Sequence, residues 1–274
     1  MRNSDVKILI RGGGDLATGT IAFLYQCGYR LLVLENDRPT SIRRTVSFSE
    51  AVYDGTTVVE GIRAKKIDSL SEAEACWREG LIPILCDSEA LSVKAFEPDI
   101  LIDAVIAKRN VGTRIDMAPL VIGLGPGFTA GVDVHLVIET QRGHRLGRII
   151  SEGCAAPNTG IPGIIAGYGK ERVMHSENAG IFTRIADIGD LVHQGDILGY
   201  IGDVPLKASI DGVLRGILKE GLFVPAHFKM ADIDPRIAEQ QNCYTISDKA
   251  RTIAGAVLLA IVKYLEQSEN RKAP

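Results

Sequence analysis

The chain has 274 residues, a formal net charge of -3 and 46% hydrophobic residues, a composition typical of a globular protein with one large or two ordinary domains. This charge argues against a general nucleic-acid-binding protein, which normally carries a basic face. The sequence has no run of about 18 uncharged apolar residues, so we expect no membrane span. The N-terminal MRNSDVKILI segment lacks the anatomy of a signal peptide, and we expect a cytoplasmic protein.

The cysteines are scattered along the chain and include no CxxC pair. Their odd number and irregular spacing predict neither a disulfide framework nor a zinc site. We expect most of them to be buried small hydrophobic residues in a reducing compartment. They are Cys27, Cys76, Cys86, Cys154 and Cys243.

The first predicted elements form a β-α-β unit around a glycine-rich turn. Residues 6–10 and 30–34 are short apolar runs typical of buried parallel strands, and residues 18–25 are predicted to be helical. The turn follows the pattern GxGxxA through Gly12, Gly14 and Ala17, with Gly13 inside it. Glu35 ends the second strand about 20 positions later, as a dinucleotide-binding fingerprint requires.

Each residue type in this turn has a physical reason. Gly12 permits the tight turn, Gly14 lets backbone N–H groups approach a phosphate, and Ala17 lets the helix lie close to the strand. The helix N-terminus adds positive potential, and Glu35 would accept hydrogen bonds from ribose hydroxyls. Asp15 either caps the helix while the glycines bind phosphate, or marks a tight corner that binds no ligand.

Strands and helices continue to alternate after this unit. The pattern predicts strands at 64–67, 81–86, 99–105 and 119–123, and helices at 71–78 and 88–95. We therefore expect an α/β fold, with a Rossmann-like, doubly wound, mostly parallel sheet in a domain spanning residues 1–155. Ligands of such sheets bind beyond the carboxyl ends of the strands. Further residues expected at that edge are Lys108, Arg109, Gly125 and Gly127.

A basic loop follows the second predicted strand. Arg38, Arg43 and Arg44 lie in NDRPTSIRRTVSF, where three guanidinium groups beside a phosphate-type turn would hold a second anionic group. The alternative is a solvated basic loop.

A strand is also predicted at residues 132–140. It would place Asp133, His135 and Glu139 on one face, because side chains alternate along a strand. These residue types can bind metal, but on an amphipathic strand they more often form a hydrated face. We predict no metal site.

The second half contains an internal repeat, in which residues 180–201 align with residues 212–233. Both copies combine short strands with a glycine at the same turn, and they resemble the biotinyl/lipoyl, or barrel-sandwich-hybrid, fold. We expect a β-rich module over residues 156–245. Lys207 does not lie at a hairpin tip, so we predict a scaffold or docking module and no attached cofactor. His227 stands where the first copy has Gly195, and His tolerates a positive φ well enough to keep the turn.

The chain ends in a predicted helix within residues 246–274, with Ser247 as N-cap. Its apolar stripe is expected to pack on the core, and an oligomer seam is the alternative. Cys243 precedes this helix and is the candidate catalytic thiol, since a helix N-terminus lowers the pKa of a thiol facing it. A structural thiol is the favoured interpretation, and Cys154 is a weaker candidate.

Several segments together resemble one family: IRGGGDLATG, RPTSIRRTVSFSEAVYDG, VIGLGPGFTAGVDVHLVIET, GHRLGRII, NTGIPG and CYTISDKAR. The family is that of the YqeB-type accessory proteins of selenium-dependent molybdenum hydroxylase systems, with a role akin to that of XdhC-type maturation factors. The resemblance implies a cytoplasmic factor that helps to mature or insert a molybdenum cofactor. It implies a molybdenum hydroxylase or other maturation proteins as partners, and it supplies no catalytic residues.

The two lines of reasoning converge on a protein that binds an anionic cofactor. A molybdopterin dinucleotide carries a pyrophosphate of the kind that the glycine turn would cradle. The alternatives are an NAD(P)-dependent oxidoreductase and a nucleotide-binding regulatory protein without chemistry. Whether the chain catalyses a reaction is left open.

Overall fold

The computed structural model describes residues 2–160 and 163–272, so Ile161 and Pro162 of the NTGIPG segment lie outside the described residues. The chain divides into two compact units. The first comprises Met1–Pro39, Phe48–Asn158 and Ile246–Pro274, and the second comprises Thr40–Ser47 and Thr159–Thr245. The expected boundaries were 1–155, 156–245 and 246–274. In the structure residues 40–47 join the second unit, the first unit extends to Asn158, and the C-terminal segment from Ile246 belongs to the first unit.

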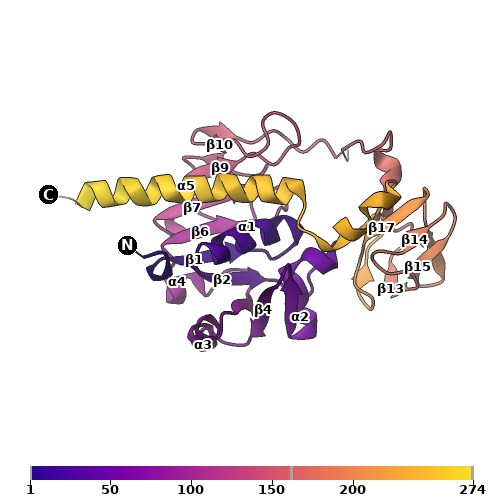
Figure 1. The fold of residues 1–274 in the computed structure, drawn as a ribbon, viewed down its shortest axis with the longest axis horizontal. Helices are drawn as coiled ribbons and strands as arrows, with labels where there is room; N and C mark the ends of the chain where they lie inside the picture. Colours follow the sequence, from indigo (N-terminus) through magenta and orange to yellow (C-terminus); the bar gives the residue numbers. More distant parts are fainter. Residues whose placement is uncertain (1, 161–162, 273–274) are drawn as a thin grey trace. The chain divides into compact units, whose positions relative to one another are not determined.

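The first unit is built on a nine-stranded sheet in the order β10-β9-β7-β6-β1-β2-β5-β4-β3 (Figure 1). Neighbouring strands from β4 to β9 are parallel, and β3 and β10 pair antiparallel at the two edges. The mixed α/β class with a large, mostly parallel sheet is therefore confirmed. The strands are β1 (Lys7–Arg11), β2 (Arg30–Glu35), β3 (Thr56–Val59), β4 (Ile62–Ile67), β5 (Ile82–Cys86), β6 (Ile100–Asp103), β7 (Leu120–Leu124), β9 (Leu136–Ile138) and β10 (Ile149–Ile150).

The helices of this unit are α1 (Asp15–Gln26), α2 (Ala51–Asp54), α3 (Ala73–Arg78), α4 (Val93–Phe96) and α5 (Asp248–Lys272). A small separate ribbon pairs β8 (Thr129–Ala130) with β11 (Gly153–Cys154). The central strands are apolar on both sides, as in Ile8, Leu9 and Ile10 of β1, which are fully buried. Such strands are buried because helices or connecting segments cover both faces of the sheet.

Two predicted elements are much shorter than expected. The helix predicted at 88–95 is reduced to α4, because the Asp87 carboxylate accepts the N–H groups of Leu91 and Ser92 and holds a turn there. The strand predicted at 132–140 is reduced to β9. Asp133 accepts the Thr129 N–H and His135 Nδ1 accepts the Val121 N–H. The expected shared face of Asp133, His135 and Glu139 was therefore wrong, since local backbone bonds end the strand early.

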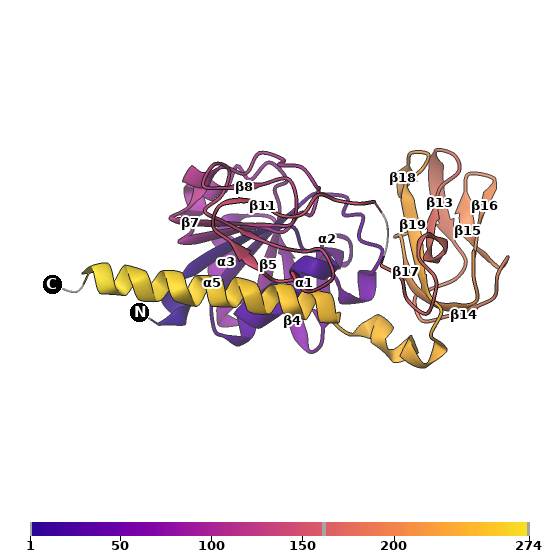
Figure 2. The ribbon, with the colours of Figure 1, turned by 90° about the horizontal axis from the view of Figure 1, so that it is seen from above.

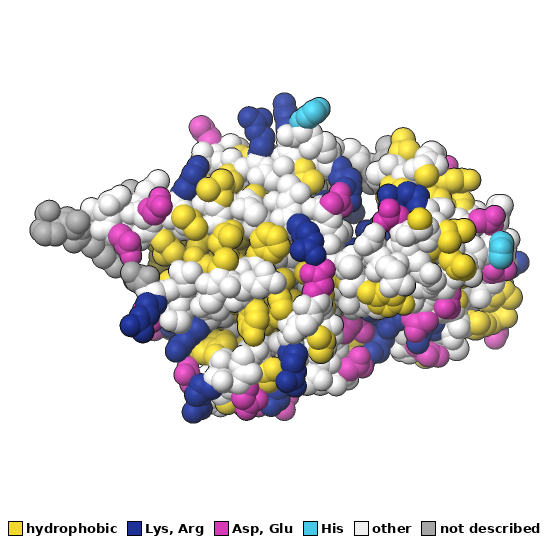
Figure 3. Space-filling model, viewed as in Figure 1, with side chains coloured by type: hydrophobic (Ala, Val, Ile, Leu, Met, Phe, Trp, Pro, Cys, Tyr) yellow, Lys and Arg dark blue, Asp and Glu magenta, His cyan; other side chains and the backbone are white. Residues whose placement is uncertain are grey.

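The C-terminal helix α5 lies beside α1 (Figures 1 and 2) and also contacts β9 and β10. The two helices approach closely at Gly19, where a Cβ atom would lie 2.6 Å from the backbone oxygen of Ala250. Three members of the expected apolar stripe, Ile253, Val257 and Ile261, are fully buried. Leu259 and Val262 remain exposed, and apolar side chains gather over the region of α5 and α1 in Figure 3.

The second unit contains two antiparallel sheets of four strands, in the orders β12-β19-β17-β14 and β16-β15-β13-β18. The expected repeat is visible in their pairing. In each copy the first strand pairs with the third strand of its own copy and with the short middle strand of the other copy. The strands are β12 (Val173–His175), β13 (Gly180–Arg184), β14 (Leu191–Val192), β15 (Ile197–Ile201), β16 (Val204–Lys207), β17 (Gly212–Ile217), β18 (Phe223–Val224) and β19 (Lys229–Asp234).

The corresponding turns of the two copies also agree. Gly195 has a φ of +94° and His227, which stands at the equivalent position, has a φ of +62°. The expectation that His227 keeps this turn is confirmed. Lys207 ends β16, away from the β15–β16 turn that follows Ile201, so it is not at the tip of that hairpin.

We expect Gly19→Ala to lower the free energy of unfolding of the first unit by about 1–3 kcal/mol, because the added methyl group overpacks the contact between α1 and α5. Gly255→Ala on α5 is the matched control, since a Cβ atom there meets no described atom within 4 Å. It should raise stability by about 0.5–1 kcal/mol through helix propensity. Urea unfolding followed by circular dichroism measures both, and equal effects of the two substitutions would contradict the close helix contact.

Candidate functional site

The glycine turn after β1 is held from inside the first unit. Gly12 has a φ of +93°, and a Cβ atom there would lie 2.9 Å from the backbone oxygen of Ala104. A Cβ atom on Gly13 would lie 3.1 Å from the Ser49 nitrogen, and Ser49 N–H donates to the Gly13 carbonyl. Gly12 is therefore required by internal packing, and Gly13 lies in tight contact with Ser49, whether or not a ligand binds.

Some backbone N–H groups of this turn have hydrogen-bond acceptors within the protein, and others do not. Gly12 N–H donates to the Leu34 carbonyl, and Gly13 N–H donates to Glu35 Oε2 at 2.8 Å. Gly14 is the N-cap of α1, and no side chain among the described residues caps the helix. Asp15 lies in the first turn without forming a cap bond, and Ala17 is buried against the rest of the unit. The first turn of α1 thus presents uncapped N–H groups at the half-buried positions 14–16.

Glu35 lies where the fingerprint requires, at the end of β2, next to the turn. Its carboxylate accepts N–H groups from Gly13 and Asn36, which orients it beside the start of α1. Burial raises the pKa of the Glu35 carboxyl, and the hydrogen bonds from Gly13 and Asn36 oppose this rise. Glu35 is thus an acceptor fixed at the rim of the turn.

The loop after β6 is pinned by a buried ionic cluster between the ends of β1 and β6. Arg11 Nη1 lies 3.6 Å from Asp103 Oδ2, and Thr113 Oγ1 donates to the same Asp103 oxygen at 2.6 Å. Arg11 Nη2 donates to the carbonyls of Ser88 and Val111. These bonds satisfy a guanidinium that is only 3% exposed and close the loop of residues 104–113 over the sheet edge.

The loops after β6 and β7 pack together at this edge. A Cβ atom on Gly127 would lie 2.7 Å from the Arg109 Cα atom, and one on Gly125 would lie 2.6 Å from Thr140 Oγ1. Lys108, with a φ of +63°, and Arg109 are exposed on the loop after β6. The structure thus brings the second glycine turn and these two cations together, as parts of one edge of the sheet.

Sequence reasoning missed Lys249, the second residue of α5. Burial and then the charge of Arg142 lower the pKa of its ammonium, while Asp15, Glu139 and Asp248 act in the opposite direction. Lys249 is half-buried, and it forms no hydrogen bond or ion pair within the described part of the chain. The sequence places it in SDKAR at a helix start, but its partial burial follows from the packing of α5 on the rest of the first unit, which the sequence does not show.

The arginine loop does not stay within one unit. Arg38 is exposed in the first unit, whereas Arg43 and Arg44 belong to the second. There Arg43 Nη2 donates to the carbonyls of Asn242 and Thr245. Arg44 donates to the Ile217 carbonyl and pairs with Asp187 at 2.8 Å. The expected ligand cluster is corrected accordingly: Arg43 and Arg44 hold residues 40–47 within the second unit.

The candidate thiol Cys243 has the environment of a structural cysteine. It is 2% exposed, and burial raises the pKa of its thiol against the lowering influence of Arg43 and Arg215. A catalytic thiol needs the opposite shift. Cys154, by contrast, is exposed, on β11.

Metal and membrane sites receive no support from the structure. The described residues include no group of three or more His, Cys, Asp or Glu side chains able to hold a metal ion. Across the described helices, none combines the length and apolar character needed to cross a membrane.

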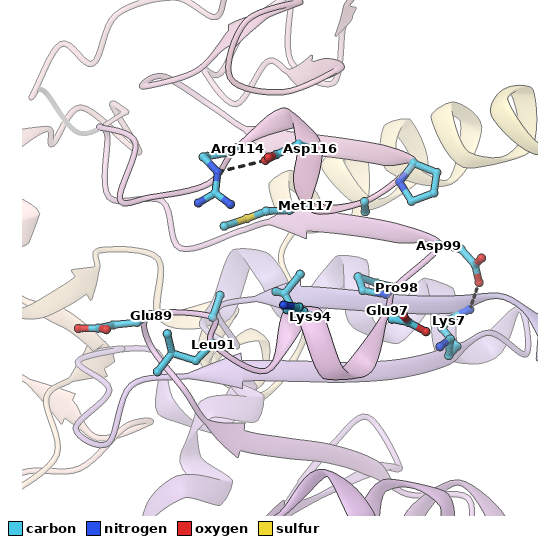
Figure 4. Close-up of a pocket in the computed structure, with 14 residues that line it drawn as sticks. Lys7, Glu89, Leu91, Lys94, Glu97, Pro98, Asp99, Arg114, Asp116 and Met117 are labelled. Atoms are coloured by element: carbon cyan, nitrogen blue, oxygen red, sulfur yellow. Dashed lines mark hydrogen bonds and ion pairs between the residues drawn. The ribbon is translucent and has the colours of Figure 1, made fainter.

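A separate groove of about 1100 Å³ lies near the amino ends of β1, β6 and β7 (Figure 4). It runs beside α4 and carries charges of both signs, including Lys7 bonded through its backbone to Asp99, and Arg114 bonded to Asp116. Ligands of open parallel sheets bind at the carboxyl ends of the strands, where the glycine turns lie. We therefore take the glycine-turn edge as the candidate site.

No family model matches the chain. The chain is 46% identical over 260 residues to "Uncharacterized protein YqeB" of Escherichia coli (strain K12), a match that covers 95% of this chain and 48% of the relative. This similarity supports the expected YqeB-type relationship over the matched region. The chain spans about half the length of this curated relative.

Solved structures give only distant likenesses. The apo ectoine utilization protein EutE (DoeB) from Ruegeria pomeroyi has a TM-score of 0.28 at 13% identity, covering 83% of this chain and 86% of that one. An aspartoacylase family protein from Mesorhizobium loti has a TM-score of 0.29 at 15% identity, covering 84% and 86%. At these scores the likeness carries no argument about fold or activity.

We expect Ellman's reagent to modify Cys154 much faster than Cys243 in the folded protein. The thiolate is the reactive form, and Cys243 is both inaccessible and shifted toward the thiol. Cys154→Ser should remove the fastest phase of the reaction, while Cys243→Ser should leave that phase unchanged. Loss of the fast phase in Cys243→Ser would restore Cys243 as a reactive candidate.

Proposed function

We propose that the first unit binds a phosphate-bearing, nucleotide-type cofactor at the carboxyl edge of its sheet. The observation that carries this proposal is the uncapped first turn of α1, which lies next to Glu35 at the end of β2. Backbone N–H groups at a helix start and the positive end of the helix dipole together favour a phosphate group.

The strand order supports this assignment. A seventh parallel strand, β4, lies beyond β5. When β4 is left out and the other six parallel strands are numbered along the chain, β5-β2-β1-β6-β7-β9 follows the order 3-2-1-4-5-6 of dinucleotide-binding sheets. The order reverses between β1 and β6, and ligands of such sheets bind at this switch point. The glycine turn follows β1 and the pinned loop follows β6, so both flank the switch point. We propose a Rossmann-like sheet on this basis.

Fewer backbone N–H groups are available to bind a pyrophosphate than the glycine pattern alone suggests. Gly13 N–H is occupied by Glu35, so the available backbone donors are those of residues 14–16. Glu35 would accept a ribose hydroxyl and would repel a 2′-phosphate, which favours a ribose without that group. We propose that these residues bind and orient the ligand, and we assign them no catalytic step.

The second unit is proposed as a scaffold or docking module with a barrel-sandwich-hybrid-like organisation. The exchange of short strands between the two copies supports this proposal, because it locks two similar halves together. Lys207 lies at the end of β16, away from the hairpin tip at which a carrier domain would be modified.

The similarity to the YqeB-type protein supports a proposal about the cellular role of the chain. We propose an accessory factor for a selenium-dependent molybdenum hydroxylase, which binds a molybdopterin-type cofactor, as its dinucleotide, for modification or insertion. The hydroxylase or another maturation protein would be its partner. The pyrophosphate of such a dinucleotide matches the donors at the start of α1.

Gly14→Asp tests the site directly. Gly14 has an extended backbone (φ -67°, ψ -178°) that other residues adopt, so the substitution should fold, and Asp should cap α1 with a gain of a few tenths of a kcal/mol. The new carboxylate should compete with phosphate for the same N–H groups and weaken binding by at least about tenfold. Gly14→Asn is the matched control, because it caps without charge.

The measurement is a thermal shift with CTP, NAD⁺, NADP⁺, inorganic pyrophosphate and molybdopterin, followed by calorimetry on the compounds that raise the melting temperature. The proposal expects at least one phosphate-bearing compound to stabilise the wild-type protein and Gly14→Asn more than Gly14→Asp. A preference for NAD⁺ would favour the oxidoreductase alternative. Equal binding to all three proteins would contradict a site at the start of α1.

A further inference from the structure

A separate cavity of the first unit, of about 510 Å³, lies at the amino end of β2, between the end of α1, the helix α3 and the start of β5. Its volume is in the range of small-molecule binding sites. Glu35 ends β2 at the candidate site, so the two regions lie at opposite ends of that strand. The residues that line the cavity include Tyr25, Tyr29, Arg30, Glu74, Trp77 and Arg78.

The aromatic side chains of this cavity differ in how their polar atoms are bonded. Trp77 Nε1 donates to the Leu31 carbonyl at 2.8 Å. The Tyr25 hydroxyl donates to the Gly80 carbonyl at 2.7 Å. The Tyr29 hydroxyl forms no hydrogen bond within the described part of the chain, although Tyr29 is only 6% exposed. Buried tyrosine hydroxyls usually have a partner, so this one requires an explanation.

The Tyr29 hydroxyl is neither fully enclosed nor ionised at neutral pH. Its oxygen is not among the fully inaccessible, unpartnered polar atoms of the described residues, so it keeps some contact with solvent. Burial and then the charge of Cys27 raise the pKa of the Tyr29 phenol, which keeps its proton. Tyr29 therefore offers a neutral hydrogen-bond donor in the wall of a cavity.

The charged residues that line the cavity leave an excess of positive charge. Arg30 Nη1 lies 3.3 Å from Glu74 Oε2, and the Arg30 guanidinium lies 5.4 Å from the centroid of the Trp77 ring. Arg78 Nε donates to the Glu74 carbonyl, and Arg78 forms no ion pair within the described chain. The lining thus carries two guanidinium groups and one carboxylate. This balance favours a ligand with one negative charge.

We infer that this cavity binds a small organic carboxylate with an apolar body, to which Tyr29 donates a hydrogen bond and Arg78 supplies the opposite charge. The rings of Tyr25 and Trp77 provide apolar surface for the body of the ligand. A guanidinium group and a hydroxyl are both common partners of a carboxylate. The inference concerns a second site, and it does not depend on phosphate binding at α1.

Trp77 is the single tryptophan of the sequence, so its fluorescence reports directly on this cavity. The test is a fluorescence titration with cyclohexanecarboxylate, which has the charge and the apolar body. Cyclohexanecarboxamide, with the body alone, and acetate, with the charge alone, are the comparison ligands. We expect a saturable change in Trp77 emission with cyclohexanecarboxylate, and binding at least about fivefold weaker for each comparison ligand.

Matched variants separate the two polar contacts. Tyr29→Phe should weaken binding of cyclohexanecarboxylate at least about fivefold, because it removes one hydrogen bond to a charged group. Arg78→Met should weaken binding of the carboxylate at least about threefold and leave binding of the carboxamide unchanged. Tyr264→Phe on α5 and Arg63→Met on β4 change the same residue types outside the cavity lining, and both should match the wild type.

A structural role of the Tyr29 hydroxyl is separated by the melting temperature. Because this hydroxyl has no partner within the described chain, Tyr29→Phe should melt within about 2 °C of the wild type or higher. A larger fall accompanied by weaker binding would assign the hydroxyl to folding and overturn its role in the site.

The remaining outcomes decide the rest of the inference. If Trp77 emission of the folded wild-type protein did not change saturably with cyclohexanecarboxylate, the cavity would not be a binding site for this class. Equal affinity for the carboxylate and the carboxamide would overturn the assignment of an anion. Gly14→Asp should bind cyclohexanecarboxylate like the wild type, and a loss there would contradict the independence of the two sites.

Discussion

The close contact of the glycine turn with the end of β6 is the constraint on which the first unit depends. Gly12 lies so near the Ala104 backbone that a side chain there would collide with it, and its positive φ directs the chain from β1 into α1. The buried side chains of Arg11 and Asp103 form an ion pair that joins the ends of β1 and β6. Together they place the start of α1 at the point where the strand order reverses, which is where such sheets bind ligands.

The glycine turn serves packing first and binding second. Gly12 is required by its contact with Ala104, Gly13 packs tightly against Ser49, and Gly13 donates its N–H to Glu35. A glycine pattern alone therefore overstates the number of donors open to a phosphate. The start of α1 has no side-chain cap, since Asp15 does not form one, and this absence of a cap supports the proposed binding site over a closed corner.

Local patterns predicted the local structure well. Apolar runs identified the central strands, and the repeat in the second half predicted two copies of short strands and the turn at His227. Contacts between distant segments were not visible in the sequence. The position of Lys249 depends on α5 packing against α1, and the bonds of Arg43 to the carbonyls of Asn242 and Thr245 join residues about 200 positions apart. Short-range hydrogen bonds from backbone N–H groups to the carboxylates of Asp87 and Asp133 accompany two elements that are shorter than periodicity alone predicts.

The central claim is that phosphate binds at the first turn of α1, and amide chemical-shift mapping tests it most directly. In ¹⁵N-labelled protein titrated with CTP or pyrophosphate, the account predicts the largest changes at the amides of Gly14, Asp15 and Leu16, with smaller changes at the start of α5. The amides of the groove beside α4 should not change. Saturable shifts confined to that groove or to the second unit, with the amides of residues 14–16 unmoved, would contradict the account.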